Sequence, residues 1–108
     1  MSAWTTICSK DDLQPNSGIC ALVGGKQIAI FYMPQLDAVY AIDNWDPIGK
    51  ANVLSRGLIG DTDGAPMVAS PLYKQHFDLA SGQCAEEEDV KVATYEIQIK
   101  DGKVEIKA

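Results

Sequence analysis

The chain has 108 residues and a formal net charge of −6, a length that suits one hydrophobic core and not two. The negative charge disfavours a nucleic-acid backbone or an anionic membrane surface as partner, because either would repel it. No apolar run approaches the ~18 residues of a membrane-spanning helix, and residues 1–4 lack the basic and apolar segments of a leader. We therefore expect a single domain, residues 1–108, in the cytoplasm.

Three cysteines, Cys8, Cys20 and Cys84, have no Cys-x-x-Cys spacing. We expect reduced thiols, at least one of them packed as a small hydrophobic side chain. A catalytic thiol would need a base nearby to lower its pKa, and the only histidine, His76, cannot be assigned to any of the three from sequence.

The first half of the chain predicts short strands joined by tight turns. Residues 4–8 alternate like a half-buried strand, and Ser9 with the following acids indicates a capped helical turn. Gly24-Gly25 predicts a two-residue hairpin between residues 19–23 and 26–32, because glycine tolerates the positive φ angles of such a turn. This register would set Ile19 against Ile30.

The second half continues this pattern. Residues 38–43 and 66–69 read as strands, and each leads into a loop with a proline near its tip. Asp101-Gly102 is the strongest hairpin signal and would set Ile97 against Ile106. The four acids Glu86 to Asp89 indicate a solvated surface segment, with docking of a basic partner as the alternative. The predicted fold is all-β, an antiparallel sandwich or small barrel with two loops at one end.

These two loops resemble those of the Rieske-type ferredoxin domain. That family typically carries Cys-Pro-His, then Leu-Ser-x-Gly, then Cys-Pro-x-His followed by Phe-Asp and a small-Gly turn. The matching positions here are Pro47, residues 54–57, Pro71, residues 77–79 and Ser81-Gly82. The resemblance implies a Rieske-like sheet that supports both loops.

The chain departs from this family at the four cluster-ligand positions, which Asp46, Ile48, Ser70 and Tyr73 occupy. A Rieske [2Fe-2S] centre takes two thiolates and two imidazoles. Ile48 has no lone pair, two positions carry hydroxyls that are protonated at neutral pH, and a carboxylate is a hard oxygen ligand. We therefore expect no iron–sulfur cluster, and no other cofactor, in this chain.

Something must fill the space that a cluster would leave, because an empty void of ~100 Å³ would cost roughly 2–3 kcal/mol. The candidates are Trp45, Ile48, Leu72 and Tyr73, large or apolar side chains at or beside the vacated positions. We expect them to leave some apolar surface at the loop end, and such a surface is often a protein-interaction site. The alternative is that they only cap the core.

His76 stands directly before Phe77-Asp78, so a metal or acid–base role with Asp46 or Asp78 is one hypothesis. A lone histidine without a second His or Cys at ligand spacing is more often structural. We expect no metal site and no catalytic residue.

A closer resemblance is to the small subunits of bacterial NAD(P)H-dependent assimilatory nitrite reductases. It rests on residues 53–59 and 68–72, with Lys74-Gln75 after Tyr73, and extends from Trp4 to Ile106. It implies an accessory role in nitrate assimilation: docking to, and stabilising, a large subunit that holds FAD, sirohaem and an iron–sulfur cluster and reduces nitrite to ammonium. Two alternatives stay open, a cluster-free binding module of another redox complex, such as an oxygenase system, and a true ferredoxin.

Overall fold

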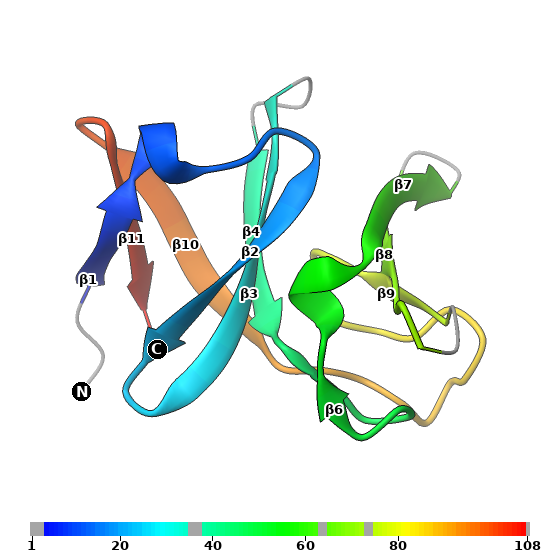
Figure 1. Ribbon diagram of the computed structural model, residues 1–108. Coiled ribbons are helices and arrows are strands. Elements are labelled where there is room, and N and C mark those ends of the chain that lie inside the picture. Colours follow the sequence, from blue (N-terminus) through cyan, green and yellow to red (C-terminus); the bar gives the residue numbers. More distant parts are fainter. Residues whose placement is uncertain (1–3, 35–37, 63–64, 73–74, 108) are drawn as a thin grey trace.

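The structure is a computed structural model that describes residues 4–34, 38–62, 65–72 and 75–107. One group of strands forms a six-stranded antiparallel sheet, in the order β1-β11-β10-β4-β3-β2, which curls into a half-barrel (Figure 1). Its strands are β1 (Trp4–Ser9), β2 (Ser17–Val23), β3 (Lys26–Met33), β4 (Ala38–Asp43), β10 (Thr94–Lys100) and β11 (Lys103–Lys107). The predicted all-β class is confirmed.

Both predicted hairpins form, with the predicted registers. Gly24 and Gly25 adopt φ angles of 56° and 82° between β2 and β3, and Ile19 pairs with Ile30. Asp101 and Gly102 adopt 52° and 75° between β10 and β11, and Ile97 pairs with Ile106. Two consecutive residues with positive φ match the right-handed twist of the flanking strands, so turn chemistry sets both registers.

A second group of short elements stands beside the half-barrel (Figure 1). It begins with the two-stranded pair β5 (Trp45–Asp46) and β6 (Ala51–Asn52), followed by the 3₁₀ turn η3 (Leu54–Arg56). A three-stranded sheet follows, with the order β7 (Leu58–Thr62), β8 (Ala65–Ala69) and β9 (His76–Asp78). Another 3₁₀ turn, η1 (Lys10–Asp12), follows β1 and has Ser9 as its N-cap, as predicted.

Two hydrophobic cores lie on opposite faces of β3 and β4, so the expectation of a single core from chain length was wrong: a strand pair covered on both faces supports one core on each. Ile28 and Ile30 point into the core inside the half-barrel, together with Ala41, Val104 and Ile106. The neighbouring β3 residues Ala29, Phe31 and Met33 point the other way, into a core shared with the second group. The other buried residues of that core are Ile42, Leu54, Val68, Phe77, Leu79, Cys84 and Val92. Because β3 is buried on both faces, its sequence is continuously apolar from Ile28 to Phe31.

None of the helical turns in the described part of the chain has the length or the apolar sequence that crossing a lipid bilayer requires.

Candidate functional site

Two loops meet at the end of the molecule that carries the second group of elements. The first loop, residues 44–53, continues directly from β4 and contains β5 and β6. The second loop, residues 70–75, connects β8 to β9, and the β7–β8 hairpin lies between the two loops in sequence. The expectation that a sheet supports both loops is confirmed.

Asn44 attaches the first loop to the half-barrel. The residue is 2% exposed, and its side-chain Oδ1 accepts a hydrogen bond from the Ser55 backbone N–H at 2.7 Å. Its Nδ2 lies 3.2 Å from Gln27 Oε1 and 3.5 Å from Cys20 Sγ. Both the oxygen and the nitrogen of this buried amide have hydrogen-bond partners, and these bonds hold the start of the loop against β2 and β3.

Asp46 and Ser70, two of the vacated ligand positions, contact each other directly. The Ser70 hydroxyl donates to Asp46 Oδ2, and the residues are 0% and 1% exposed. The other carboxylate oxygen, Oδ1, accepts the backbone N–H groups of Ile48 at 2.9 Å and Gly49 at 3.0 Å. A buried side-chain bond therefore joins the two loops where the resemblance had pointed to ligands, a contact that sequence reasoning had missed.

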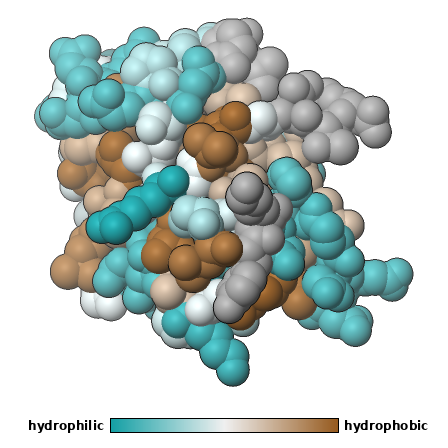
Figure 2. Space-filling model, turned by 45° about the vertical axis from the view of Figure 1, so that its right-hand side comes forward, coloured by the Kyte–Doolittle hydropathy of each residue, from teal (hydrophilic) through white to brown (hydrophobic). Residues whose placement is uncertain are grey.

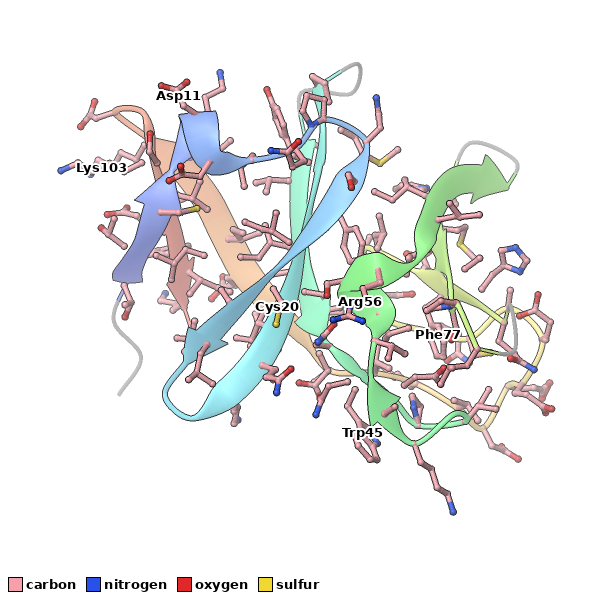
Figure 3. All side chains as sticks on the ribbon, in the orientation of Figure 1. Asp11, Cys20, Trp45, Arg56, Phe77 and Lys103 are labelled. Atoms are coloured by element: carbon pink, nitrogen blue, oxygen red, sulfur yellow. The ribbon has the colours of Figure 1, made fainter. Side chains whose placement is uncertain are left out.

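The predicted contact residues differ in their placement. Trp45 is 43% exposed and lies at the edge of the molecule (Figure 3), and Leu72 is 47% exposed, so both leave apolar surface on the two loops. Ile48 is half-buried and packs against the core that contains Phe77. Tyr73 lies outside the described residues. For Trp45 and Leu72 a large exposed apolar side chain suits a contact surface.

Leu58 adds apolar surface beside the second loop and was not among the predicted contact residues. It is 80% exposed, whereas its neighbour Ile59 packs against the core. Alternation along β7 was the available signal, because two consecutive apolar residues in a strand point to opposite faces. An open pocket beside the second loop is lined by Arg56, Leu58, Ala69, Ser70, Pro71 and His76. On this face, Figure 2 shows hydrophobic residues next to the grey atoms at the centre of the view.

Comparison with known proteins agrees with this geometry. A family model for the Rieske-like [2Fe-2S] domain matches residues 3–107. The chain belongs to the Rieske-like [2Fe-2S] domain family.

Three relatives of this Rieske-like domain are informative. The nitrite reductase (NADH) small subunit of Salmonella typhimurium is 50% identical over 107 residues, 99% of each protein. The solved structure of the E. coli protein NirD is 48% identical, has a TM-score of 0.91, and covers 100% of this chain and 98% of its own. A segment of the Klebsiella oxytoca nitrite reductase [NAD(P)H] large subunit is 44% identical over 101 residues, which are 94% of this chain and 10% of that protein.

The loops of this Rieske-like domain do not fit the cluster for which the family is named. Such a centre needs thiolates and imidazoles, whereas the described ligand positions supply a carboxylate, an alkyl chain and a hydroxyl. Asp46 and Ser70 also use their oxygens on each other and on loop N–H groups. Over the described residues, no three His, Cys, Asp or Glu side chains gather closely enough to hold a metal ion.

The three thiols lie away from the loop tips. Cys84 is buried in the core with Phe77, Cys8 is half-buried, and Cys20 is exposed on β2. Burial raises the pKa of the Cys8 thiol, and Asp12 adds to the effect. Partial desolvation of its sulfur also raises the pKa of the Cys20 thiol, against an opposing influence of Arg56. A raised pKa lowers the thiolate fraction, so neither Cys8 nor Cys20 has the environment of an activated nucleophile.

His76 pairs with Glu86, the first acid of the predicted acidic run. Its ring Nδ1 lies 2.7 Å from Glu86 Oε2, and its backbone N–H donates to Oε1 at 2.7 Å. The rest of that run is exposed, and Gln83 Nε2 holds its backbone through the carbonyls of Glu87 and Glu88. His76 therefore anchors a surface loop to β9, and the hypothesis of a site with Asp46 or Asp78 has no contact to support it among the described residues.

Substituting Glu86 tests this anchor through its pH dependence. The backbone N–H of His76, and then its ring, lower the pKa of the Glu86 carboxyl from the ordinary value of 4.5. A lowered pKa means that the ionised carboxylate stabilises the folded chain above this value, and that the contribution is lost as the pH falls through the folded-state pKa. Glu86→Gln is therefore expected to reduce stability at pH 7, with a difference from the wild type that shrinks in acid.

Urea unfolding at several pH values measures this difference. Glu88→Gln, a change at an exposed acid of the same run, serves as the matched control and is expected to change stability by less than about 0.5 kcal/mol throughout. The same change in unfolding free energy at each pH for both variants would contradict the role of Glu86 in holding the surface loop to His76.

Proposed function

We propose that this chain is the small subunit of an NAD(P)H-dependent nitrite reductase, which acts in the cytoplasm in nitrate assimilation. In this role it binds the large subunit and stabilises it. It holds no cluster and takes no part in the chemistry of nitrite reduction. FAD, sirohaem and an iron–sulfur cluster, which the resemblance implies, would belong to the large subunit, because such cofactors supply the redox steps.

The observation that carries this proposal is the full-length similarity to the Salmonella small subunit, 50% identical over 99% of both chains. The Klebsiella protein supports the choice of partner. Its large subunit includes a segment similar to 94% of this chain. A covalent link keeps such a segment at a high local concentration next to the rest of the subunit, and a separate chain must replace this link with a binding surface.

The candidate surface is the loop end, with Trp45 exposed on the first loop, Leu72 exposed on the second, and Leu58 beside the second loop. Exposed aromatic and aliphatic anchors are typical of the energetically important centre of an interface. Ile48 and Tyr73 remain candidates, although Ile48 also packs on the core. The net charge of −6 makes nucleic acid and anionic membranes poor alternative partners.

Reconstitution from purified subunits tests the proposal. The cognate large subunit is prepared with and without this chain, and NAD(P)H-dependent nitrite reduction is measured alongside size-exclusion chromatography. We expect a stable complex, and activity that declines without the chain and recovers when it is added. Full activity and stability of the large subunit alone would refute the accessory role, and bound iron with visible absorption in the isolated chain would refute its cluster-free state.

A further inference from the structure

The Asp46–Ser70 bond is formed at two positions where the family's pattern has cluster ligands. Because the cluster ligands of the family come from both loops, a bound cluster would also join them. We infer that in this chain the Asp46–Ser70 pair is the structural replacement for that link, and that it holds the two loops in the arrangement that presents Trp45 and Leu72. The second half of this inference rests on the proposed function, whereas the first does not.

Within the first loop, Asp46 is the organising residue. Its Oδ1 accepts two backbone N–H groups, from Ile48 at 2.9 Å and Gly49 at 3.0 Å, and its own carbonyl accepts the Lys50 N–H at 2.6 Å. These bonds form a tight turn, which an aspartate at such a position commonly makes. They use one carboxylate oxygen and leave Oδ2 for a partner outside the loop.

Ser70 is the organising residue of the second loop. Its hydroxyl donates to Asp46 Oδ2 and accepts the Leu72 N–H at 3.3 Å. Its backbone N–H donates to the Gln75 carbonyl at 2.9 Å, which closes the loop. One hydroxyl therefore connects the turn of the second loop to the turn of the first, across 24 residues of sequence.

Burial makes this hydrogen bond costly to break. A carboxylate at 0% exposure has no access to bulk water, so each of its oxygens needs a donor from the protein. Ser70 is the donor to Oδ2. If the loops separated, Asp46 would lose that donor, and the bond therefore opposes movement of one loop relative to the other.

The two exposed anchors are attached to this pair. Trp45 precedes Asp46, and Leu72 follows Ser70 by two residues, with its N–H bonded to the Ser70 hydroxyl. Packing confirms how closely the loops approach: a Cβ placed on Gly49 would lie 2.5 Å from Leu72 Cδ1 and 2.9 Å from Asp46 Oδ2. A surface fixed before binding loses less conformational freedom in the complex.

Amide hydrogen exchange on Ser70→Ala tests the link without any partner. Losing the donor to Oδ2 should loosen the carboxylate, so exchange at the Ile48 and Gly49 amides is expected to accelerate by about tenfold. The matched control is Ser81→Ala, which removes an exposed serine hydroxyl that accepts the Gln83 N–H. It should leave both first-loop amides unchanged.

Unchanged exchange at Ile48 and Gly49 in Ser70→Ala would overturn the link, because Asp46 would then hold the first loop by itself. Leu72 is not diagnostic, since its amide loses its acceptor under either interpretation. Should Ser70→Ala fail to fold, Ser70→Cys keeps a side chain of similar shape with a weaker donor and is read by the same two amides.

Affinity for the large subunit tests the second half. We expect Ser70→Ala to weaken binding about tenfold, the equivalent of roughly 1.4 kcal/mol, and Ser81→Ala to leave it unchanged. Faster exchange with unaltered affinity would remove the role of the link in presenting the anchors. Failure of the wild-type chain to bind would reject the proposed function, and the exchange data would still decide whether the loops are linked.

Discussion

Replacing Trp45 and Leu72 together with glutamate is expected to weaken binding to the large subunit by about a hundredfold or more. Buried anchors of an interface each contribute about 2 kcal/mol or more on truncation, and roughly 1.4 kcal/mol corresponds to a factor of ten. Both side chains are exposed over two-fifths of their surface, at 43% and 47%. A new carboxylate would also have to be desolvated in the complex, which adds to the loss.

Binding is measured by titration calorimetry with the purified large subunit, and the fold of the variant by circular dichroism. The chain provides a closely matched control in Trp4 and Leu22, which are 39% and 73% exposed on β1 and β2 of the half-barrel. Trp4→Glu combined with Leu22→Glu changes the same residue types and adds the same charge. Equal loss of affinity in both double variants would contradict docking through the loop end.

Replacing Phe31 with alanine is expected to lower the free energy of unfolding by roughly 3–5 kcal/mol, the usual cost of truncating a fully buried phenylalanine. Phe31 is 0% exposed in the core between the half-barrel and the second group of elements. Its ring is in close contact with the neighbouring strand, because a Cβ on Gly18 would lie 2.7 Å from Phe31 Cε1. Such a tightly packed site has little room to collapse around a cavity.

Urea unfolding monitored by tryptophan fluorescence gives this difference directly. Leu22→Ala, at an exposed position of β2, is the control and is expected to change stability by less than about 0.5 kcal/mol. A loss below about 1 kcal/mol for Phe31→Ala would mean that the second group of elements does not depend on this core for its attachment.

Much of the sheet could be predicted from local sequence. The Gly24-Gly25 and Asp101-Gly102 turns specify φ angles that few other residues tolerate, and with them the pairing of four strands. The sequence of β3 does not show which of its residues face which core, because its apolar run is continuous and has no alternation with polar residues. The division into two cores depends on the second group of elements covering one face.

The loop end was predictable in position and composition. The proline-containing loops, the loss of cluster ligands and the exposed Trp45 and Leu72 all follow from residues 44–82 read as a pattern. The exposure of Leu58 could have been inferred from alternation in β7. The pairing of His76 with Glu86 could not have been inferred, because the sequence does not specify the path of the turn between the two residues.

The amino-acid sequence alone determined the all-β class, the hairpin registers, the Rieske-like framework and the absence of thiolate and imidazole ligands from the loops. These features depend on residue type and on neighbours a few positions apart. Only the tertiary structure decided that Asp46 and Ser70 meet and bury their bond. Whether two polar side chains 24 residues apart face water or each other depends on how the packed sheets bring their loops together, and no local preference encodes that distance.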